Sequence, residues 1–222
     1  PQFVRDGWLN LNGEWQFEID NGRSGESRGL QNENIKLKDK IIVPFCPESK
    51  LSGLAHTDFM DGVVYRKTIT LSEAEAASTV MLHFGAVDYE AKPYINNTYV
   101  GIHKGGYTSF SFDISKYVAA GENTIFLTVT DMGRSKLQPT GKQCFIYESI
   151  GCEYTRTTGI WQTLCMEFLP KAHIVSAKYY PDIDNSCLGI TGIVSGKGTL
   201  TITASWEGKT VGTKTVNVAN ST

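Results

Sequence analysis

The stretch VDYEAKPYINNTYVGIHKGGYTSFSFDIS, from Val87 to Ser115, decides the class of fold. Polar and apolar residues alternate from Val87 to Asn96 and again from Phe110 to Ile114, and this period of two is typical of strands with one buried face. Asn96 and Asn97 lie between two such runs, and asparagine tolerates the positive φ that a two-residue hairpin turn requires. The stretch therefore predicts antiparallel strands joined by a tight hairpin.

The same alternation recurs along most of the chain, whereas a helical period is rare. Only Ser72–Ala77 is expected to be helical, as a short turn that Ser72 caps. Further strands are predicted over Glu14–Ile19, Val63–Leu71, Thr79–Phe84 and Thr124–Thr130. We therefore predict an all-β fold.

The amino-acid composition changes after Leu169-Pro170, where small residues, threonines and glycines become frequent. This change predicts a domain boundary near Pro170, with domains at 1–171 and 172–222. An immunoglobulin-like sandwich needs roughly 100 residues and about seven strands. The second segment offers about half of that, so we expect a partial sandwich and a natural protein that continues past Thr222. Its strands are predicted at Ile174–Tyr180, Leu188–Val194, Thr199–Trp206 and Val211–Val218.

Composition limits the classes of function. A formal charge of −2 gives no long-range attraction for phosphates or anionic lipids, so neither nucleic acid nor membrane is an expected partner. The five cysteines are odd in number and form no C-x-x-C pair, which favours a reducing compartment, and we expect a soluble, cytoplasmic protein. A bridge between Cys144 and Cys152 stays open as the less favoured alternative. The four histidines lack ligand spacing, so we predict no metal site and no cofactor.

Polar residues gather in EYTRTTGIWQTL, from Glu153 to Leu164. Turns need only Gly, Pro, Asn or Asp for their backbone angles, so Glu153, Tyr154 and Arg156 exceed what a turn requires. They either lock a loop or face a ligand. The preceding stretch, Gly133–Gly151, is predicted to be a long ordered loop, and loops of this length commonly serve a site or a lid.

A second candidate segment is KGGYT, from Lys104 to Thr108. Gly105 and Gly106 allow the backbone to approach another surface closely, and Tyr107 offers a flat apolar face with a polar tip. This combination suits sugar recognition. The alternative is a strand corner whose tyrosine fills a domain interface.

Five segments together resemble the N-terminal sugar-binding domain of glycoside hydrolase family 2, which includes β-galactosidases and β-glucuronidases. They span nearly all of residues 1–171, and residues 172 onward resemble the start of the family's immunoglobulin-like domain. The segments are LNLNGEWQF (Leu9–Phe17), VVYRKTITL (Val63–Leu71), Val87–Ser115, AAGENTI (Ala119–Ile125) and YTRTTGIWQTL (Tyr154–Leu164).

The resemblance implies a jelly-roll, galactose-binding-like β-sandwich, then the immunoglobulin-like sandwich, then a catalytic TIM barrel beyond Thr222. Retaining hydrolysis uses two carboxylic acids about 5 to 5.5 Å apart, and in the family both are barrel glutamates. We therefore expect no catalytic residue in this chain and no hydrolysis by it alone. The dipeptide Asn32-Glu33 copies the family's Asn-Glu pair, but its polar surroundings indicate a solvated surface.

The resemblance also implies that loops of this domain complete the pocket for the terminal sugar. An acid stands in relatives where Glu153 falls, and a carboxylate can accept from two adjacent sugar hydroxyls. Glu153 is therefore the first choice for substrate contact. For Arg156 a structural role, pairing with Glu153 or with the barrel, is preferred. Where some β-galactosidases hold sodium through an aspartate, the Lys104–Thr108 loop has glycine, so sodium is not expected. The predicted substrate-binding residues are Glu153, Tyr154, Arg156, Gly105, Gly106 and Tyr107.

Three functions stay open at this point. The chain could be the non-catalytic front of an exo-acting β-glycosidase, a stand-alone carbohydrate-binding module, or a structural domain for homo-oligomers, as relatives often assemble. Trp8, Trp15 and Trp161 are expected in a core or interface. Asp88, Glu90 and Lys92 alternate on one strand face, which predicts a solvated surface.

Overall fold

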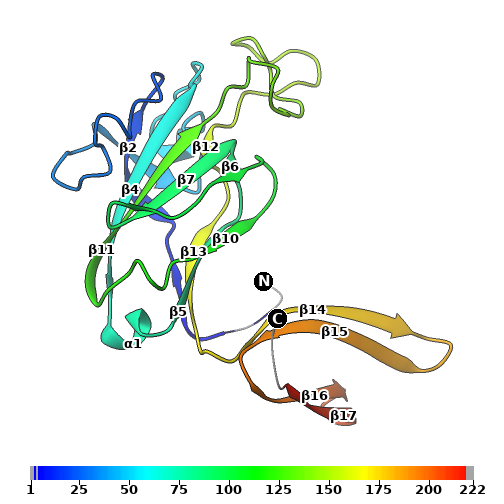
Figure 1. The fold of residues 1–222 in the computed structure, drawn as a ribbon. Coiled ribbons are helices and arrows are strands. Elements are labelled where there is room, and N and C mark those ends of the chain that lie inside the picture. Colours follow the sequence, from blue (N-terminus) through cyan, green and yellow to red (C-terminus); the bar gives the residue numbers. More distant parts are fainter. Residues whose placement is uncertain (1–2, 4, 219–222) are drawn as a thin grey trace. The chain divides into compact units, whose positions relative to one another are not determined.

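The computed structural model describes residue 3 and residues 5–218 (Figure 1). The chain divides into two compact units, Pro1–Phe168 and Leu169–Thr222. Strands dominate both units, which confirms the predicted all-β class. No helix among the described residues is long and apolar enough to cross a membrane.

The first unit is a sandwich of two antiparallel sheets. In the order of hydrogen-bonded neighbours, sheet I contains β1 (Trp8–Asn10), β13 (Leu164–Leu169), β5 (Thr79–Phe84) and β10 (Phe110–Asp113). Sheet II contains β3 (Asp39–Val43), β2 (Gly13–Ile19), β4 (Gly62–Leu71), β11 (Gly121–Thr130), β7 (Glu90–Ile95) and β8 (Thr98–Tyr99), with β9 (His103–Lys104) beside β7. A small separate ladder joins β6 (Val87–Asp88) to β12 (Gly159–Ile160).

The inward faces of the two sheets share one hydrophobic core. Trp15 and Tyr65 from sheet II and Leu82 and Met166 from sheet I all belong to it, and all are buried. The Trp15 indole, predicted to lie in the core, donates its N–H to the Leu11 carbonyl at 2.8 Å. Alternation of side chains along each strand produces this core, because every second residue points inward.

Two local predictions are confirmed. Asn96 and Asn97 have φ of 49° and 65° and connect β7 to β8 in a two-residue hairpin. The short helix α1 (Glu73–Ala76) has Ser72 as its N-cap, in a capping box with Glu75. A 3-10 turn, η1 (Lys50–Ser52), lies between β3 and β4.

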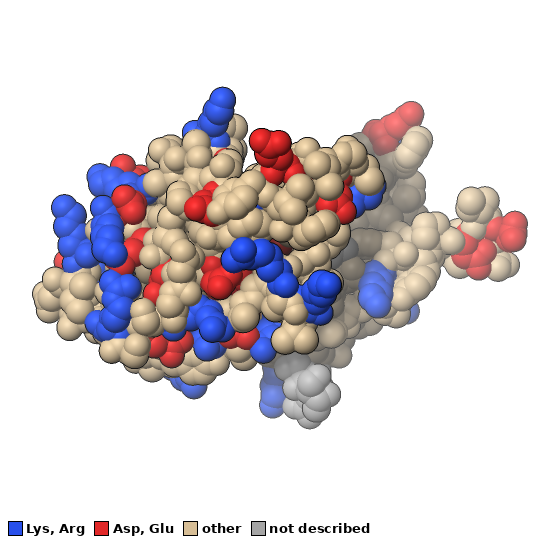
Figure 2. Space-filling view, turned by 90° about the horizontal axis from the view of Figure 1, so that it is seen from above, with Lys and Arg blue, Asp and Glu red and all other residues tan. Residues whose placement is uncertain are grey.

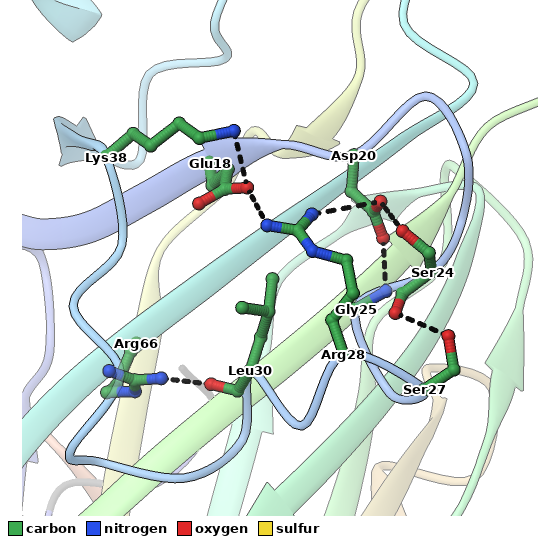
Figure 3. Close-up of polar contacts among 9 residues, drawn as sticks. All are labelled: Glu18, Asp20, Ser24, Gly25, Ser27, Arg28, Leu30, Lys38 and Arg66. Atoms are coloured by element: carbon green, nitrogen blue, oxygen red, sulfur yellow. Dashed lines mark hydrogen bonds and ion pairs between the residues drawn. The ribbon is translucent and has the colours of Figure 1, made fainter.

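The outer face of sheet II is covered by the loop of residues 20–38, as Figure 3 shows. The guanidinium of Arg66 on β4 donates to the carbonyls of Leu30 and Ile35, which fixes the far part of this loop. Glu18 on β2 is buried, and it binds Arg28 at 2.6 Å and Lys38 at 3.0 Å. Burial alone would raise the pKa of Glu18, but these two cations hold it below its usual range.

A small second core forms beneath this loop, from Leu30, Leu37, Val64, Tyr94 and Phe126. Asn32 and Glu33 lie in the loop and are exposed, as expected of a solvated surface. The loop therefore covers the part of the outer face of sheet II that Val64, Tyr94 and Phe126 form, whereas Glu14 and Lys40 on the same face stay exposed.

The second unit contains two antiparallel hairpins, β14 (His173–Asp182) with β15 (Cys187–Ser195) and β16 (Gly198–Trp206) with β17 (Lys209–Val218). These strands agree with the four that the sequence predicts. No residue from 172 to 218 is buried, so this unit has no closed core of its own. Its assignment as part of an immunoglobulin-like sandwich stays a prediction.

Candidate functional site

The segment that begins at Glu153 is held by a few backbone hydrogen bonds to the loop that precedes it. Residues 142–144 run beside residues 153–155, with an isolated parallel bridge between Gln143 and Tyr154. Tyr154 donates its N–H to the Lys142 carbonyl at 2.9 Å, and its own carbonyl accepts from Cys144 at 2.7 Å. A turn closes just before these hydrogen bonds, because the N–H of Glu153 donates to the Ile150 carbonyl at 2.9 Å. The long loop is therefore ordered, as predicted.

Arg156 fixes the base of this loop from within. Its side chain is only 7% exposed, and its guanidinium donates to the carbonyls of Ile146 and Tyr147 and to that of Thr57 in another loop. The guanidinium also lies over the Phe59 ring, 4.3 Å from the centroid. Its partners are backbone carbonyls rather than Glu153. The geometry supports a structural role for Arg156 but not the predicted pairing with Glu153, and pairing with a barrel or contact with substrate stays a prediction.

Part of the hydrogen-bonding capacity of Glu153 is unused in the described residues. The Oε2 atom is buried, yet it has no hydrogen-bond partner among the residues that the structure describes. A buried carboxylate oxygen without a partner carries a free-energy cost of desolvation, about 1–3 kcal/mol or more. A ligand hydroxyl that donated to this atom would remove that cost.

The GGY corner, formed by Gly105, Gly106 and Tyr107, lies against a buried carboxylate. Gly105 has φ of 139°, in the region that favours glycine, and donates its N–H to the Tyr89 carbonyl at 3.1 Å. A Cβ added at Gly106 would collide with the carboxylate of Asp88, so only glycine fits there without a shift. The carbonyl of Gly106 accepts from the indole N–H of Trp161 at 2.7 Å. Positive φ thus explains Gly105, and close packing against Asp88 explains Gly106.

Gln143 joins the two predicted segments. Its Nε2 donates to Asp88 Oδ2 at 2.6 Å and to the Tyr107 hydroxyl at 3.1 Å, while its Oε1 accepts from the N–H of Thr157 at 2.8 Å. Burial and the neighbouring Tyr154 hydroxyl raise the pKa of Tyr107. The structure therefore brings Gly105, Gly106, Tyr107 and Tyr154 together around one amide.

The two tyrosine rings are half exposed, at 49% for Tyr107 and 45% for Tyr154. Tyr107 also meets Trp161 edge to face, with ring centroids 5.8 Å apart. The phenol of Tyr107 donates to the Thr140 carbonyl at 3.1 Å. The Tyr107 ring is thus anchored at its hydroxyl, and both rings keep exposed apolar surface.

Three buried carboxylates lie beneath this site: Glu48, Asp88 and Asp131. Thr158 connects two of them, because its N–H donates to Glu48 at 3.2 Å and its hydroxyl to Asp131 at 2.9 Å. Burial raises the pKa of all three, and for Asp88 burial and the charge of Asp131 raise the pKa to about 7. No set of three or more His, Cys, Asp or Glu side chains in the described part of the chain is arranged to hold a metal ion.

The prediction of a solvated Asp88 is wrong. Its side chain is 1% exposed, while Glu90 and Lys92 do behave as surface residues and pair at 3.5 Å. Trp8 does not lie in a core, since 54% of it is exposed, and its place in an interface stays a prediction. Gln143 was not a candidate in the sequence, because no local pattern marks an amide whose three partners come from elsewhere in the chain.

Charges of both signs are mixed on one face of the molecule. Figure 2 shows acidic and basic side chains interspersed across the visible face rather than gathered in a patch of one sign. This distribution fits the formal charge of −2 and favours a neutral or weakly charged ligand over a polyanion.

Comparison with protein families finds a match within the first unit. Residues 54–163 match the sequence model described as "Glycosyl hydrolases family 2, sugar binding domain". A β-galactosidase of Thermoanaerobacter pseudethanolicus is 32% identical over 138 residues, which cover 60% of this chain and 18% of the relative. A putative β-glucuronidase of Formosa agariphila is 29% identical over 175 residues, which cover 76% of this chain and 19% of the relative. The chain thus spans about a fifth of these relatives.

Solved structures share the fold. A β-glucuronidase of Lactobacillus rhamnosus matches with a TM-score of 0.74 at 18% identity, covering 96% of this chain and 38% of that enzyme. A β-glucuronidase of Ruminococcus gnavus, solved with uronic deoxynojirimycin, matches with a TM-score of 0.74 at 16% identity, covering 96% of this chain and 39% of that enzyme. At these identities the likeness establishes the architecture alone.

Proposed function

Because this chain carries the sugar-binding domain of the family 2 glycosyl hydrolases, we propose that it is the non-catalytic N-terminal portion of a retaining, exo-acting β-glycosidase. The named relatives support a β-galactosidase or β-glucuronidase type for the whole enzyme. The two carboxylic acids of the chemistry belong, in this proposal, to a TIM barrel that follows Thr222. The role of this chain is to complete the pocket for the terminal sugar.

The open acceptor on Glu153 is the observation that carries the proposal. The backbone hydrogen bonds at Tyr154 hold the segment in place, and Oε2 is buried without a partner among the described residues. A carboxylate can accept from two neighbouring hydroxyls of one sugar ring, and such charge-assisted hydrogen bonds are stronger than neutral ones. The preformed loop lowers the entropy cost of that contact.

Tyr107 and Tyr154 support the same assignment. Their rings are half exposed and anchored near one another, so they offer flat apolar surface to the C–H face of a sugar. In the full-length enzyme we place both near the rim of the pocket, with Glu153 nearest the substrate hydroxyls.

The surface of the long loop supports a covering domain. Leu137 is 89% exposed, and Phe145, Tyr147 and Ile150 of the same loop are exposed as well. Apolar side chains gathered on one loop favour a protein partner over water. We assign that partner to the enzyme's own barrel. Homo-oligomer formation through the second unit is the further proposal that the resemblance suggests.

Replacement of Glu153 by glutamine in the full-length enzyme tests the site. Glu153→Gln keeps the shape but removes the charge and one acceptor, so we expect kcat/KM to fall roughly 10- to 100-fold without loss of stability. Glu148→Gln is the matched control, because Glu148 is an exposed residue of the same loop. If the two variants had equal kinetics, Glu153 would not contact the substrate and the proposal would be wrong.

A further inference from the structure

A row of four side chains crosses the outer face of sheet I, with one residue from each strand. Trp8 on β1 stands opposite Glu167 on β13, and His83 on β5 stands opposite Ser111 on β10. His83 Nε2 lies 2.9 Å from Glu167 Oε2, which joins the two pairs. Cross-strand partners share a face of the sheet, so all four side chains point away from the core.

Hydrogen bonds fix the orientation of the row. Arg5 donates from Nη1 to both oxygens of Glu167, at 3.0 Å each. Because a carboxylate only accepts, His83 Nε2 carries the proton toward Glu167, and in the neutral ring Nδ1 accepts from the hydroxyl of Ser111 at 2.6 Å. The oxygen of Ser111 then keeps its lone pairs toward solvent as acceptors. The row is therefore organised before any ligand arrives.

Trp8 supplies the apolar part of this surface. Its indole is 54% exposed at one end of the row, beside the Arg5–Glu167 pair. A flat aromatic face next to oriented planar hydrogen-bonding groups matches a pyranose ring, which presents C–H bonds on its faces and hydroxyls at its edge. The charges of Arg5 and Glu167 compensate each other, so the surface favours a neutral ligand over an anion.

We propose that this row, made of Trp8, Glu167, His83 and Ser111 with Arg5, is a carbohydrate-binding surface for neutral saccharides, separate from the Glu153 site. It lies on the outer face of sheet I, whereas Glu153 belongs to the loop that follows β11. The surface needs no residue from a barrel, so it operates in this chain by itself and does not depend on the function proposed for Glu153.

The same residue types occur in hydrolase triads, but the geometry favours binding. In that triad the serine meets Nε2 of the histidine and the carboxylate meets Nδ1. Here the two nitrogens are exchanged, because Ser111 meets Nδ1 and Glu167 meets Nε2. Both oxygens of Glu167 are also bound by Arg5. The row is a set of oriented acceptors and donors rather than a nucleophile with its base.

The test uses the 222-residue chain and two neutral probes, lactose and β-1,4-galactotetraose. We expect nitrogen-15 NMR titration to shift the Trp8 indole N–H and the amides of His83 and Ser111 in a saturable manner. Trp8→Ala is expected to weaken binding about tenfold, and Ser111→Ala measurably. Trp206→Ala, which removes an exposed tryptophan of the second unit, is expected to leave the affinity unchanged.

Three results would overturn the proposal: no saturable shifts, shifts confined to Tyr107 and Glu153, or equal affinity in Trp8→Ala and the parent chain. If Trp8→Ala lowers the unfolding temperature, Trp8→Phe and Ser111→Ala decide instead. Ser111 is exposed on the edge strand β10, so its removal is not expected to disturb the fold. Unchanged affinity in both of these variants would overturn the proposal as well.

Discussion

We expect Asp88 to make the free energy of unfolding depend on pH. Its Oδ2 accepts from Gln143, while Oδ1 is buried with no partner among the residues described. Burial, and then the charge of Asp131, raise the pKa of Asp88 to about 7 from an ordinary value of 3.8. Between these two values the unfolded chain has released its proton and the folded chain retains it. This part of the stability is therefore complete below pH 3.8 and is lost as the pH rises to about 7.

The first prediction concerns Asp88→Asn. We expect the variant to lose part of the decline in the free energy of unfolding between pH 4 and 7, a decline of at most about 1.4 kcal/mol per pH unit for one group. Above pH 7 the variant should be at least as stable as the parent, because no charge has to be buried at this position. Burial also raises the pKa values of Glu48 and Asp131. These two groups therefore account for the decline in stability that remains in the variant.

Urea unfolding at pH 5 and pH 8 measures this effect in the 222-residue chain. Asp39→Asn is the control, because Asp39 is an exposed aspartate of β3. Equal pH dependence for the two variants would show that Asp88 is ionised throughout the range.

The burial of Asp88 could not be predicted from the sequence. Alternation assigned it to the same face as Glu90 and Lys92, and for those two the assignment is correct. The corner at Gly106 and the amide of Gln143 cover Asp88 from positions 18 and 55 residues away in sequence. A periodic pattern describes which face a side chain occupies, but it contains no information about what later segment lies on that face.

At the scale of elements, the loop after β11 is organised by the amide of Gln143. Its three hydrogen bonds reach Asp88, Tyr107 and Thr157, which belong to three different segments. Most of the longer strands were predictable, because each depends on a local period. The loop was predictable only as an ordered stretch, because its partners are distant in sequence. The proximity of the GGY corner to the Tyr154 segment follows from this amide and from no local motif.

The second prediction follows from those three bonds. Gln143→Ala leaves the N–H of Thr157 and a carboxylate oxygen of Asp88 without their partner, and we expect a loss of about 1–3 kcal/mol in the free energy of unfolding. Amide hydrogen exchange across residues 140–158 should accelerate more than exchange in β4 or β11. Gln162→Ala, at an exposed glutamine, is the matched control. Identical unfolding and exchange in the two variants would mean that the amide does not hold the loop.

At the scale of the whole molecule, the two units differ in how they bury apolar surface. The first has a core between two sheets, and the loop of residues 20–38 covers a second core. The second has four strands in two hairpins, with Ile183, Leu188, Trp206 and Val211 exposed. Alternation predicted the four strands of the second unit and the longer strands β2, β4, β5, β7 and β11 of the first, but not β3 or β13. It could not predict how well each set is buried, because burial depends on which sheet lies opposite.

The last prediction concerns this difference in burial. A two-stranded hairpin without a covering layer is marginally stable in water, whereas strands at the centre of a sandwich open only with global unfolding. In the 222-residue chain, we therefore expect amides of β14–β17 to exchange hydrogen orders of magnitude faster than those of β4 and β11. Truncation to residues 1–170 should leave exchange in β4 and β11 unchanged, because both described cores lie within the first unit. Protection in β14–β17 equal to that in β4 would contradict this view and would indicate that another layer covers the hairpins in solution.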